Sequence, residues 1–282
     1  MKSMKSMKNI VKSLLAAALG LSLVFGLAAC KDNEEKESEI VIKTVDDLKT
    51  MNLSAQRGTV GQEIAEDLLG DQSEKLLKTY EKYADAIQAL NQGKVQAVIM
   101  DEKPASNFVA KDDSLVIMDP PIQEENYAIG IKKGNSDMLD AVNGTIERML
   151  ADGSLEELVK KYENIDDVKA SDIDLNEGAA GGSLIVGTEA GFAPYELKVA
   201  DGYIGIDIEL CAEIAKDQDK ELVIKDMAFD SLPAALNAGQ VDLICAGITV
   251  TPEREENMDF SATYFEGAKQ VAVVLKSEYE GE

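Results

Sequence analysis

Hydrophobic and polar positions change period repeatedly along residues 44–282: short apolar runs alternate with segments whose apolar residues lie three or four apart. The first pattern is typical of strands buried in a sheet, and the second of amphipathic helices. Their alternation predicts an α/β fold of mainly parallel sheets flanked by helices. In the first half of the chain we expect strands near 53–56, 76–79, 95–100 and 115–118, and helices near 60–69, 85–91 and 104–111.

The second half repeats this alternation. Residues 127–132 and 270–275 have alternating apolar positions, which predict two strands near a hinge. The other expected strands lie near 184–188, 222–225 and 241–246, and the expected helices near 137–151, 155–162, 206–216, 231–237 and 252–257.

An internal echo predicts two lobes. ALNQGKVQAVI at 89–99 and ALNAGQVDLI at 235–244 each predict a helix that ends at a glycine and is followed by a strand. A common turn recurring by chance is the alternative explanation. Residues 166–182 are rich in Gly, Ala and acids without periodicity, and predict a linker. We therefore expect a smaller lobe at 44–126 and a larger lobe, with this linker, at 127–282.

The first thirty residues predict export. Four lysines precede an apolar run at Leu14–Ala29, which is followed by Cys30. A basic start, a short apolar core and small residues before the cut are typical of a secretory signal, here residues 1–29. Small residues directly before Cys30 resemble a bacterial lipobox. We expect lipidation of Cys30, a polar tether at 30–43, and attachment to the extracytoplasmic face of the cell membrane. An uncleaved anchor is the alternative.

Charge and composition exclude several classes of protein. The chain has 53 acidic and 28 basic residues, a net charge of −25, so binding of nucleic acid is not expected. It has no histidine, which excludes histidine-based triads and histidine metal ligands, and we expect no metal and no cofactor. Cys211 and Cys245 lie in apolar segments and are interpreted as small buried hydrophobes. A disulfide between them is the alternative.

Several motifs resemble a known family in a rotated order. LIVGTEAGFAPYE at 184–196, GYIGIDIELCAEIA at 202–215 and AGITVTPEREENMDFS at 246–261 are similar to the opening of polar amino-acid-binding proteins of ABC transporters. The usual continuation resembles residues 44–65, 94–105 and 127–162. The chain thus resembles a bacterial extracellular solute-binding protein of family 3, circularly permuted. This resemblance implies a two-lobed periplasmic-binding-protein-like fold of type II.

The resemblance also implies how a ligand carboxylate is held. Arg254 follows Thr251 and Pro252, which suit the start of a helix, and its planar guanidinium can bind both carboxylate oxygens. An ordinary surface arginine is the alternative. Gly247 and Thr249 match the contacts beside this arginine. From the other lobe, Thr59 and the backbone N–H of Val60 match the residues that complete the carboxylate site.

Other matching positions imply contacts to the rest of an amino acid. Asp101 matches the acid that binds the ammonium group, although it could simply cap the next helix. Phe192 and Phe229 match aromatic walls around the ligand side chain, with core packing as the alternative. Glu189 stands where relatives have a polar residue that selects the side chain, and favours a cationic or amide group. Gln56 and Arg57 are second-tier candidates, and Tyr195 is expected to pack.

The resemblance implies that the protein captures a polar amino acid between its lobes and delivers it to the permease of an ABC importer. We expect a monomer without catalytic activity. A sensor of amino acids, a dehydratase-like enzyme on the same fold, and a fusion of two half-proteins are the alternatives. The permutation is also expected to keep one covalent crossing between the lobes, at 127–132, and to open the other between 275–282 and 40–44.

Overall fold

The computed structural model describes residues 40–281. The predicted signal peptide and Cys30 lie outside this range, so the structure says nothing about them. Within the described range, no helix combines the length and the apolar character needed to cross a bilayer. Both cysteines of this range are free and buried, as expected for small hydrophobes in a core.

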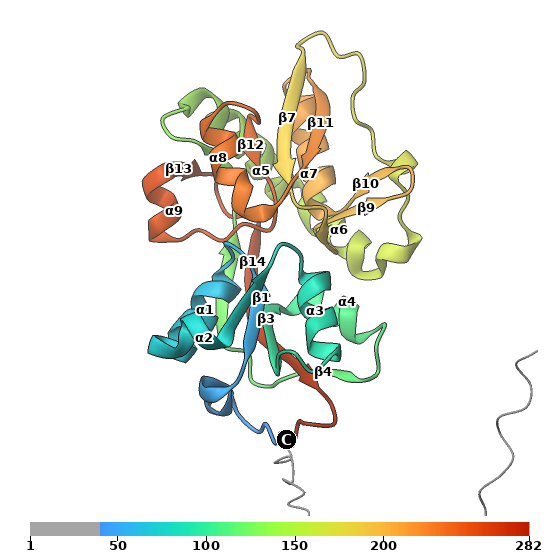
Figure 1. Cartoon of the computed structure of the whole chain (residues 1–282). Coiled ribbons are helices and arrows are strands. Elements are labelled where there is room, and N and C mark those ends of the chain that lie inside the picture. Colours follow the sequence, from blue (N-terminus) through green and yellow to red (C-terminus); the bar gives the residue numbers. More distant parts are fainter. Residues whose placement is uncertain (1–39, 282) are drawn as a thin grey trace, which may run out of the picture. The chain divides into compact units, whose positions relative to one another are not determined.

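The first sheet has the strand order β2-β1-β3-β14-β4, and β5 also pairs with β14 (Figure 1). β1 is parallel to β2 and β3, whereas β14 is antiparallel to β3, β4 and β5. The strands are β1 (Leu53–Gln56), β2 (Leu77–Tyr80), β3 (Ala97–Asp101), β4 (Leu115–Ile117), β5 (Gln123–Tyr127) and β14 (Phe265–Leu275). The helices between them are α1 (Val60–Leu69), α2 (Ser73–Leu76), α3 (Tyr83–Asn91) and α4 (Glu102–Val109).

The second sheet has the order β11-β7-β12-β6-β13. β7 is parallel to β11 and β12, and β6 is antiparallel to β12 and β13. These strands are β6 (Gly130–Lys132), β7 (Ser183–Thr188), β11 (Glu221–Asp226), β12 (Leu243–Ile244) and β13 (Met258–Phe260). A small antiparallel sheet contains β8 (Gly191–Phe192), β9 (Glu196–Val199) and β10 (Gly202–Ile204). The helices are α5 (Ser136–Asp152), α6 (Ser154–Lys161), α7 (Ile206–Asp217), α8 (Leu232–Asn237) and α9 (Pro252–Asn257).

The two large sheets share one plan. In each, three parallel strands are followed by an antiparallel strand that enters directly from the other sheet, β14 in the first and β6 in the second. We call residues 40–127 and 265–281 the first lobe and residues 128–264 the second lobe. The shared plan gives a structural basis for the internal echo, because the echoed segments are α3–β3 and α8–β12.

One predicted boundary differs from the structure. The sequence placed 265–282 in the larger lobe, but β14 pairs with β3 from Gln270 opposite Asp101 to Val274 opposite Ala97. Its backbone groups therefore complete the first sheet. Periodicity had identified a strand at 270–275 correctly, yet it could not specify which sheet that strand joins.

The chain crosses between the lobes twice, and both crossings are covalent. It leaves the first lobe between β5 and β6 and returns between β13 and β14. The two ends of the described chain meet on the first lobe, where the N–H of Ile42 donates to the carbonyl of Glu278 (2.7 Å) and the N–H of Glu280 donates to Ile42 (2.8 Å). The expected opening of one crossing is therefore wrong, because the long strand β14 carries the chain back before it ends.

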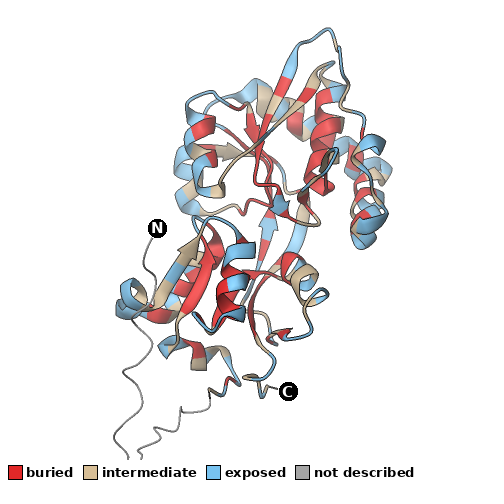
Figure 2. Cartoon of the chain, turned by 45° about the vertical axis from the view of Figure 1, so that its right-hand side comes forward, coloured by how far each residue is buried: buried red, intermediate tan, exposed pale blue. Residues whose placement is uncertain are grey.

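Local sequence explains why the elements form where they do. In α1, Val60, Ile64, Ala65 and Leu69 recur on one face, and this face packs against the first sheet. The hydroxyl of Thr59 accepts from the N–H of Gln62 and caps the helix. Figure 2 shows the resulting pattern, with buried strands and helices that are buried on one side.

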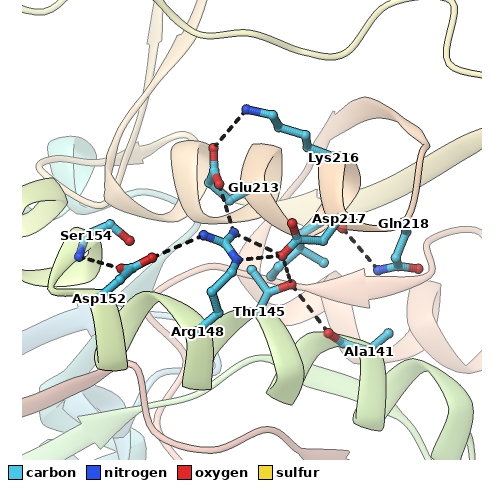
Figure 3. A network of polar contacts seen from close by, with 10 residues as sticks. Ala141, Thr145, Arg148, Asp152, Ser154, Glu213, Lys216, Asp217 and Gln218 are labelled. Atoms are coloured by element: carbon cyan, nitrogen blue, oxygen red, sulfur yellow. Dashed lines mark hydrogen bonds and ion pairs between the residues drawn. The ribbon is translucent and has the colours of Figure 1, made fainter.

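A polar network joins α5 to α7 in the second lobe (Figure 3). The Arg148 guanidinium donates to Glu213 and Asp217, at 2.9 Å each, and the hydroxyl of Thr145 also donates to Asp217. α5 lies in the segment 127–162, and α7 lies in the segment 202–215, which the sequence analysis interpreted as distant parts of one rotated pattern. Both segments thus pack in one lobe.

The segment 166–182 runs along this lobe with only short 3-10 turns and no longer helix or strand. Its side chains are not all solvated, because Ile173 is buried and Leu175 packs against the core. The Leu175 carbonyl accepts from the N–H of Leu222, which fixes the segment beside β11.

Candidate ligand-binding cavity

A cavity lies where the two lobes meet. The space between its lining atoms measures about 320 Å³, open solvent at its mouth included. All of the residues predicted as ligand contacts line it, namely Thr59, Val60, Asp101, Glu189, Phe192, Phe229, Gly247, Thr249 and Arg254. The structure therefore brings the predicted set together, while the role of each residue in binding stays a prediction.

Arg254 extends from the start of α9 into this cavity. The hydroxyl of Thr251 accepts from the N–H of Arg254 and caps the helix, as expected. The guanidinium donates to the carbonyl of Thr249 (2.8 Å) and, across the lobes, to the carbonyl of Gly58 (2.9 Å). It also lies 5.5 Å from the centre of the Phe229 ring. Burial lowers the pKa of this guanidinium from its usual value, and nearby carboxyl groups oppose that shift.

The backbone at position 247, which lines the same cavity as Arg254, needs a glycine. Gly247 has a φ of +53°, and a side chain at this position would clash with the ring of Phe192. Its N–H donates to Asp207 (2.8 Å), and Tyr264 donates to the same carboxyl group. The fully buried carboxyl group of Asp207 thus fixes the loop that contains Gly247 and Thr249.

On the first lobe, Thr59 and Val60 form the start of α1. The Thr59 hydroxyl donates to the carbonyl of Gln56 (2.8 Å) and accepts from the N–H of Gln62. Its hydrogen atom therefore already has a partner within the protein. Val60 is the first helical residue, where the backbone N–H has no partner within the helix. This geometry suits the predicted role of the Val60 amide as a donor to an anion.

Asp101 does not cap the helix that follows it, although it precedes α4 directly. Instead its carboxyl group accepts from the hydroxyl of Tyr127 and is 5% exposed. Burial raises the pKa of Asp101 well above its usual value, and the nearby Glu125 adds to this increase. The alternative interpretation of Asp101 as a helix cap is therefore not supported.

Glu125 is a cavity residue that the sequence analysis missed. It lies on β5 and is 7% exposed, and its Oε1 atom accepts from Gln270 (2.8 Å). The burial of β5 alternates, and Glu125 lies on the same side as the buried Tyr127. The sequence of this strand, QEENY, has no alternation of apolar and polar residues, so the burial of Glu125 could not be predicted from it.

Glu189 lies at another side of the cavity and is 3% exposed. Its carboxyl group accepts from the amide of Gln56 (3.2 Å), and the ammonium group of Lys82 lies 3.9 Å away. Both partners come from the first lobe. Burial raises the pKa of Glu189, and the hydrogen bond from Gln56 opposes this increase. Gln56, a second-tier candidate, thus lines the cavity, whereas Arg57 pairs with Asp230 outside it.

A second buried carboxyl pair underlies the cavity. Glu196, also missed from the sequence, lines the cavity and is fully buried beside Asp207. Burial raises the pKa of Glu196 well above its usual value, and it raises the pKa of Asp207 to about 6. The aromatic ring of Tyr195, which precedes Glu196, packs in the core between Phe192 and Tyr127, as expected.

Direct contacts join the lobes around the cavity. The ring of Tyr83 on the first lobe stacks on Phe192 at 6.0 Å. The amide of Asn107 on α4 donates to the carbonyl of Ala193 (2.7 Å). Together with the hydrogen bond from Arg254 to Gly58, these contacts hold the two lobes closed around the cavity.

Acidic side chains outnumber basic side chains in the lining of the cavity. Four carboxyl groups line the cavity, those of Asp101, Glu125, Glu189 and Glu196, and they face the single guanidinium of Arg254. The site can accept an anionic group at the guanidinium and more than one cationic group elsewhere.

The structure thus has two α/β lobes with one charged cavity between them. Residues 184–280 match the family described as bacterial extracellular solute-binding proteins, family 3. This match over the last part of the chain supports the resemblance inferred from the motifs. The matched segment includes Glu189, Phe192, Gly247 and Arg254.

Curated relatives are similar to parts of the chain. The arginine-binding extracellular protein ArtP of Bacillus subtilis (strain 168) is 44% identical over 32% of this chain and 36% of its own length. The L-cystine-binding protein TcyJ of Escherichia coli (strain K12) is 31% identical over 48% of this chain and 50% of its own length. The chain thus spans only about a third to a half of these relatives, which are named as binding proteins.

Among solved structures, the arginine-bound form of domain 1 from TmArgBP is 36% identical to this chain. The similarity covers 35% of this chain and 82% of that domain, with a TM-score of 0.30.

Proposed function

We propose that this protein binds an amino acid between its two lobes and delivers it to the permease of an ABC importer. One observation carries the proposal: a guanidinium from the second lobe and a carboxyl group from the first lobe, those of Arg254 and Asp101, line the same cavity. A zwitterion needs both charges at once. An amino acid can therefore bridge the lobes, with its carboxylate at Arg254 and its ammonium at Asp101.

Within this proposal, the ligand has a cationic side chain. A zwitterion uses one cation and one anion of the site, and three further carboxyl groups remain in the lining. Glu189 lies beside the aromatic wall formed by Phe192, as suits a cationic group on an aliphatic stem. The arginine-binding function that ArtP is named for supports the same choice.

We further propose that the chain is a circular permutation of this family. The family match is confined to the last part of the chain, whereas the motifs at 44–162 resemble the usual continuation. The packing of α5 against α7 and the placement of 166–182 along the second lobe support a join between former ends. The protein would act as a monomer, tethered to the extracytoplasmic face of the membrane through a lipid on Cys30.

A screen of the twenty amino acids by thermal shift tests the proposed function, because a ligand that binds the folded state raises the melting temperature. We expect L-arginine or L-lysine to give the largest shift. Chromatography of the same mixtures should show unchanged amino acid, which contradicts a dehydratase. Uptake that depends on the protein in cells separates delivery from sensing alone. A protein that none of the amino acids stabilises would contradict the proposal.

A further inference from the structure

Asp101 and Glu125 bring two carboxyl groups together in the first-lobe wall of the cavity. Asp101 ends β3 and Glu125 lies on β5, and both strands pair with β14. Gln270 on β14 faces Asp101 in the sheet and donates through its amide to Oε1 of Glu125. Both carboxyl groups line the cavity, and the charge of Glu125 raises the pKa of Asp101 further above its usual value.

One oxygen of this pair lacks a partner. Among the described residues, the Oε2 atom of Glu125 has no hydrogen-bond partner although it is buried. Asp101 accepts from the neutral hydroxyl of Tyr127. A buried carboxylate oxygen without a partner is costly, and a proton or a bound cation would remove that cost.

The surroundings provide little positive charge. Burial raises the pKa of the hydroxyl groups of Tyr83 on α3 and Tyr195 in the second lobe, and the charge of Asp101 adds to this increase, so both hydroxyl groups stay neutral. Glu189 is a further acid on the opposite lobe. Arg254 is the cation of the lining, and it donates to the carbonyls of Thr249 and Gly58 rather than to this pair. Two adjacent carboxyl groups in such a site do not both ionise readily.

We propose that Asp101 and Glu125 share one proton in the ligand-free protein, and that an ammonium group of the ligand replaces this proton. This inference rests on the proposed function. The protonated pair carries one negative charge. When the ammonium binds with all of its hydrogens, the pair releases its proton to solvent and carries two negative charges. Glu125 is thereby a second ligand-contacting acid beside Asp101.

This exchange makes binding depend on pH in a defined direction. Because binding releases a proton, a higher pH favours the bound state, by about tenfold in affinity per pH unit at most, which corresponds to one proton. The dependence ends at the pH where the ligand-free pair is already fully ionised.

Calorimetric titration of L-arginine into the mature protein, in buffers with different ionisation enthalpies, measures the released proton. For the wild type we expect a release approaching one proton. Glu125→Gln should lower the release to near zero and weaken binding roughly tenfold or more, the size of one charge-assisted hydrogen bond. Glu124→Gln is the matched control, since this neighbour is exposed, and it should leave both quantities unchanged. Equal proton release in wild type and Glu125→Gln would overturn the inference.

Infrared absorption of protonated carboxyl groups in the ligand-free protein separates this inference from the proposed function. Glu125→Gln and Asp101→Asn should each remove the same part of that band at neutral pH. If the band is lost in both variants but no amino acid binds the wild type, the shared proton is supported and the proposed function fails. If L-arginine binds the wild type without proton release and the band is unchanged, the inference fails and the proposed function stands.

Discussion

The guanidinium of Arg254 on the second lobe donates to the carbonyl oxygen of Gly58 on the first, with 2.9 Å between Nη2 and oxygen. The residue predicted to hold a ligand carboxylate thus also bonds directly to the opposite lobe. Gly58 lies just before Thr59 and Val60, the predicted first-lobe part of the same carboxylate site. Arg254 is therefore placed so that ligand capture and contact between the lobes involve one side chain.

Replacement of Arg254 by alanine is expected to abolish amino-acid binding without unfolding the protein. The variant leaves a ligand carboxylate unpaired, which should cost about 2–5 kcal/mol of binding free energy. Calorimetry measures the affinity, and circular dichroism checks the fold. Arg148→Ala is the matched control, because Arg148 contacts Glu213 and Asp217 on the second lobe and is absent from the cavity lining. Near-normal affinity in Arg254→Ala would refute the assignment.

Asn107 is expected to stabilise the closed arrangement of the lobes. Loss of its bond to Ala193 in Asn107→Ala should weaken apparent binding by about 0.5–1.5 kcal/mol, because the competent closed population falls. Small-angle scattering should show that saturating L-arginine lowers the radius of gyration of the wild type. The variant should need more ligand to reach the same radius.

Asn91→Ala serves as the control for this effect, since Asn91 donates to Asp112 within the first lobe. If both asparagine variants bind equally well, the contact between Asn107 and Ala193 makes no contribution to closure.

Asp207 should make stability depend on pH. Burial raises its pKa from 3.8 to about 6, so the folded protein binds more protons than the unfolded chain between these values. The contribution of Asp207 to the free energy of unfolding is therefore fully present below pH 3.8 and is lost as the pH rises through about 6. Its size is on the order of 2–3 kcal/mol.

Urea unfolding between pH 4 and pH 8 measures this dependence. Asp207→Asn should flatten the decline of the unfolding free energy in that window, and the exposed Asp46→Asn should not. A decline of equal slope in wild type and Asp207→Asn would show that another group is responsible.

The order in which the segments are joined along the chain should have little effect on ligand binding. A rearranged protein that starts at Ser183 and joins Glu282 directly to Ile40 keeps both crossings between the lobes, as the present chain does. We expect its affinity for L-arginine to agree within a factor of about two, or about 0.4 kcal/mol. Calorimetry on both proteins gives the comparison. A tenfold difference would show that the paired ends near Ile42 and Glu278 influence closure.

The sequence predicted much of the fold because several elements have strong local signals. β1 and α1 were predicted at the residues where the structure has them, since an apolar run, a capping threonine and a periodic helix follow one another. The hairpin strands β8, β9 and β10 were not predicted. Their short, glycine-punctuated segments have too few residues for a period to be recognised, and they form only through pairing with one another.

Only some of the residues that line the cavity were predicted from the sequence. Resemblance supplied residues such as Arg254 and Asp101 because they lie in recognisable motifs. Glu125, Glu196 and Gln270 were missed because their importance arises from burial between strands that are distant in sequence. A polar residue in a strand is ordinarily expected at the surface, and only the tertiary structure shows that these side chains face inward.

The central place of β14 has a consequence for the order in which the protein can be completed during synthesis. All strands of the second lobe's sheet lie between residues 130 and 260, so this lobe has its full set before β14 has been made. The first sheet cannot join β3 to β4 until residues 265–275 are available. Until then both strands present unpaired backbone edges that invite association with other chains. The half of the cavity with Asp101 and Glu125 is thus the last to form, and it is the half in which a chaperone would have the most to protect.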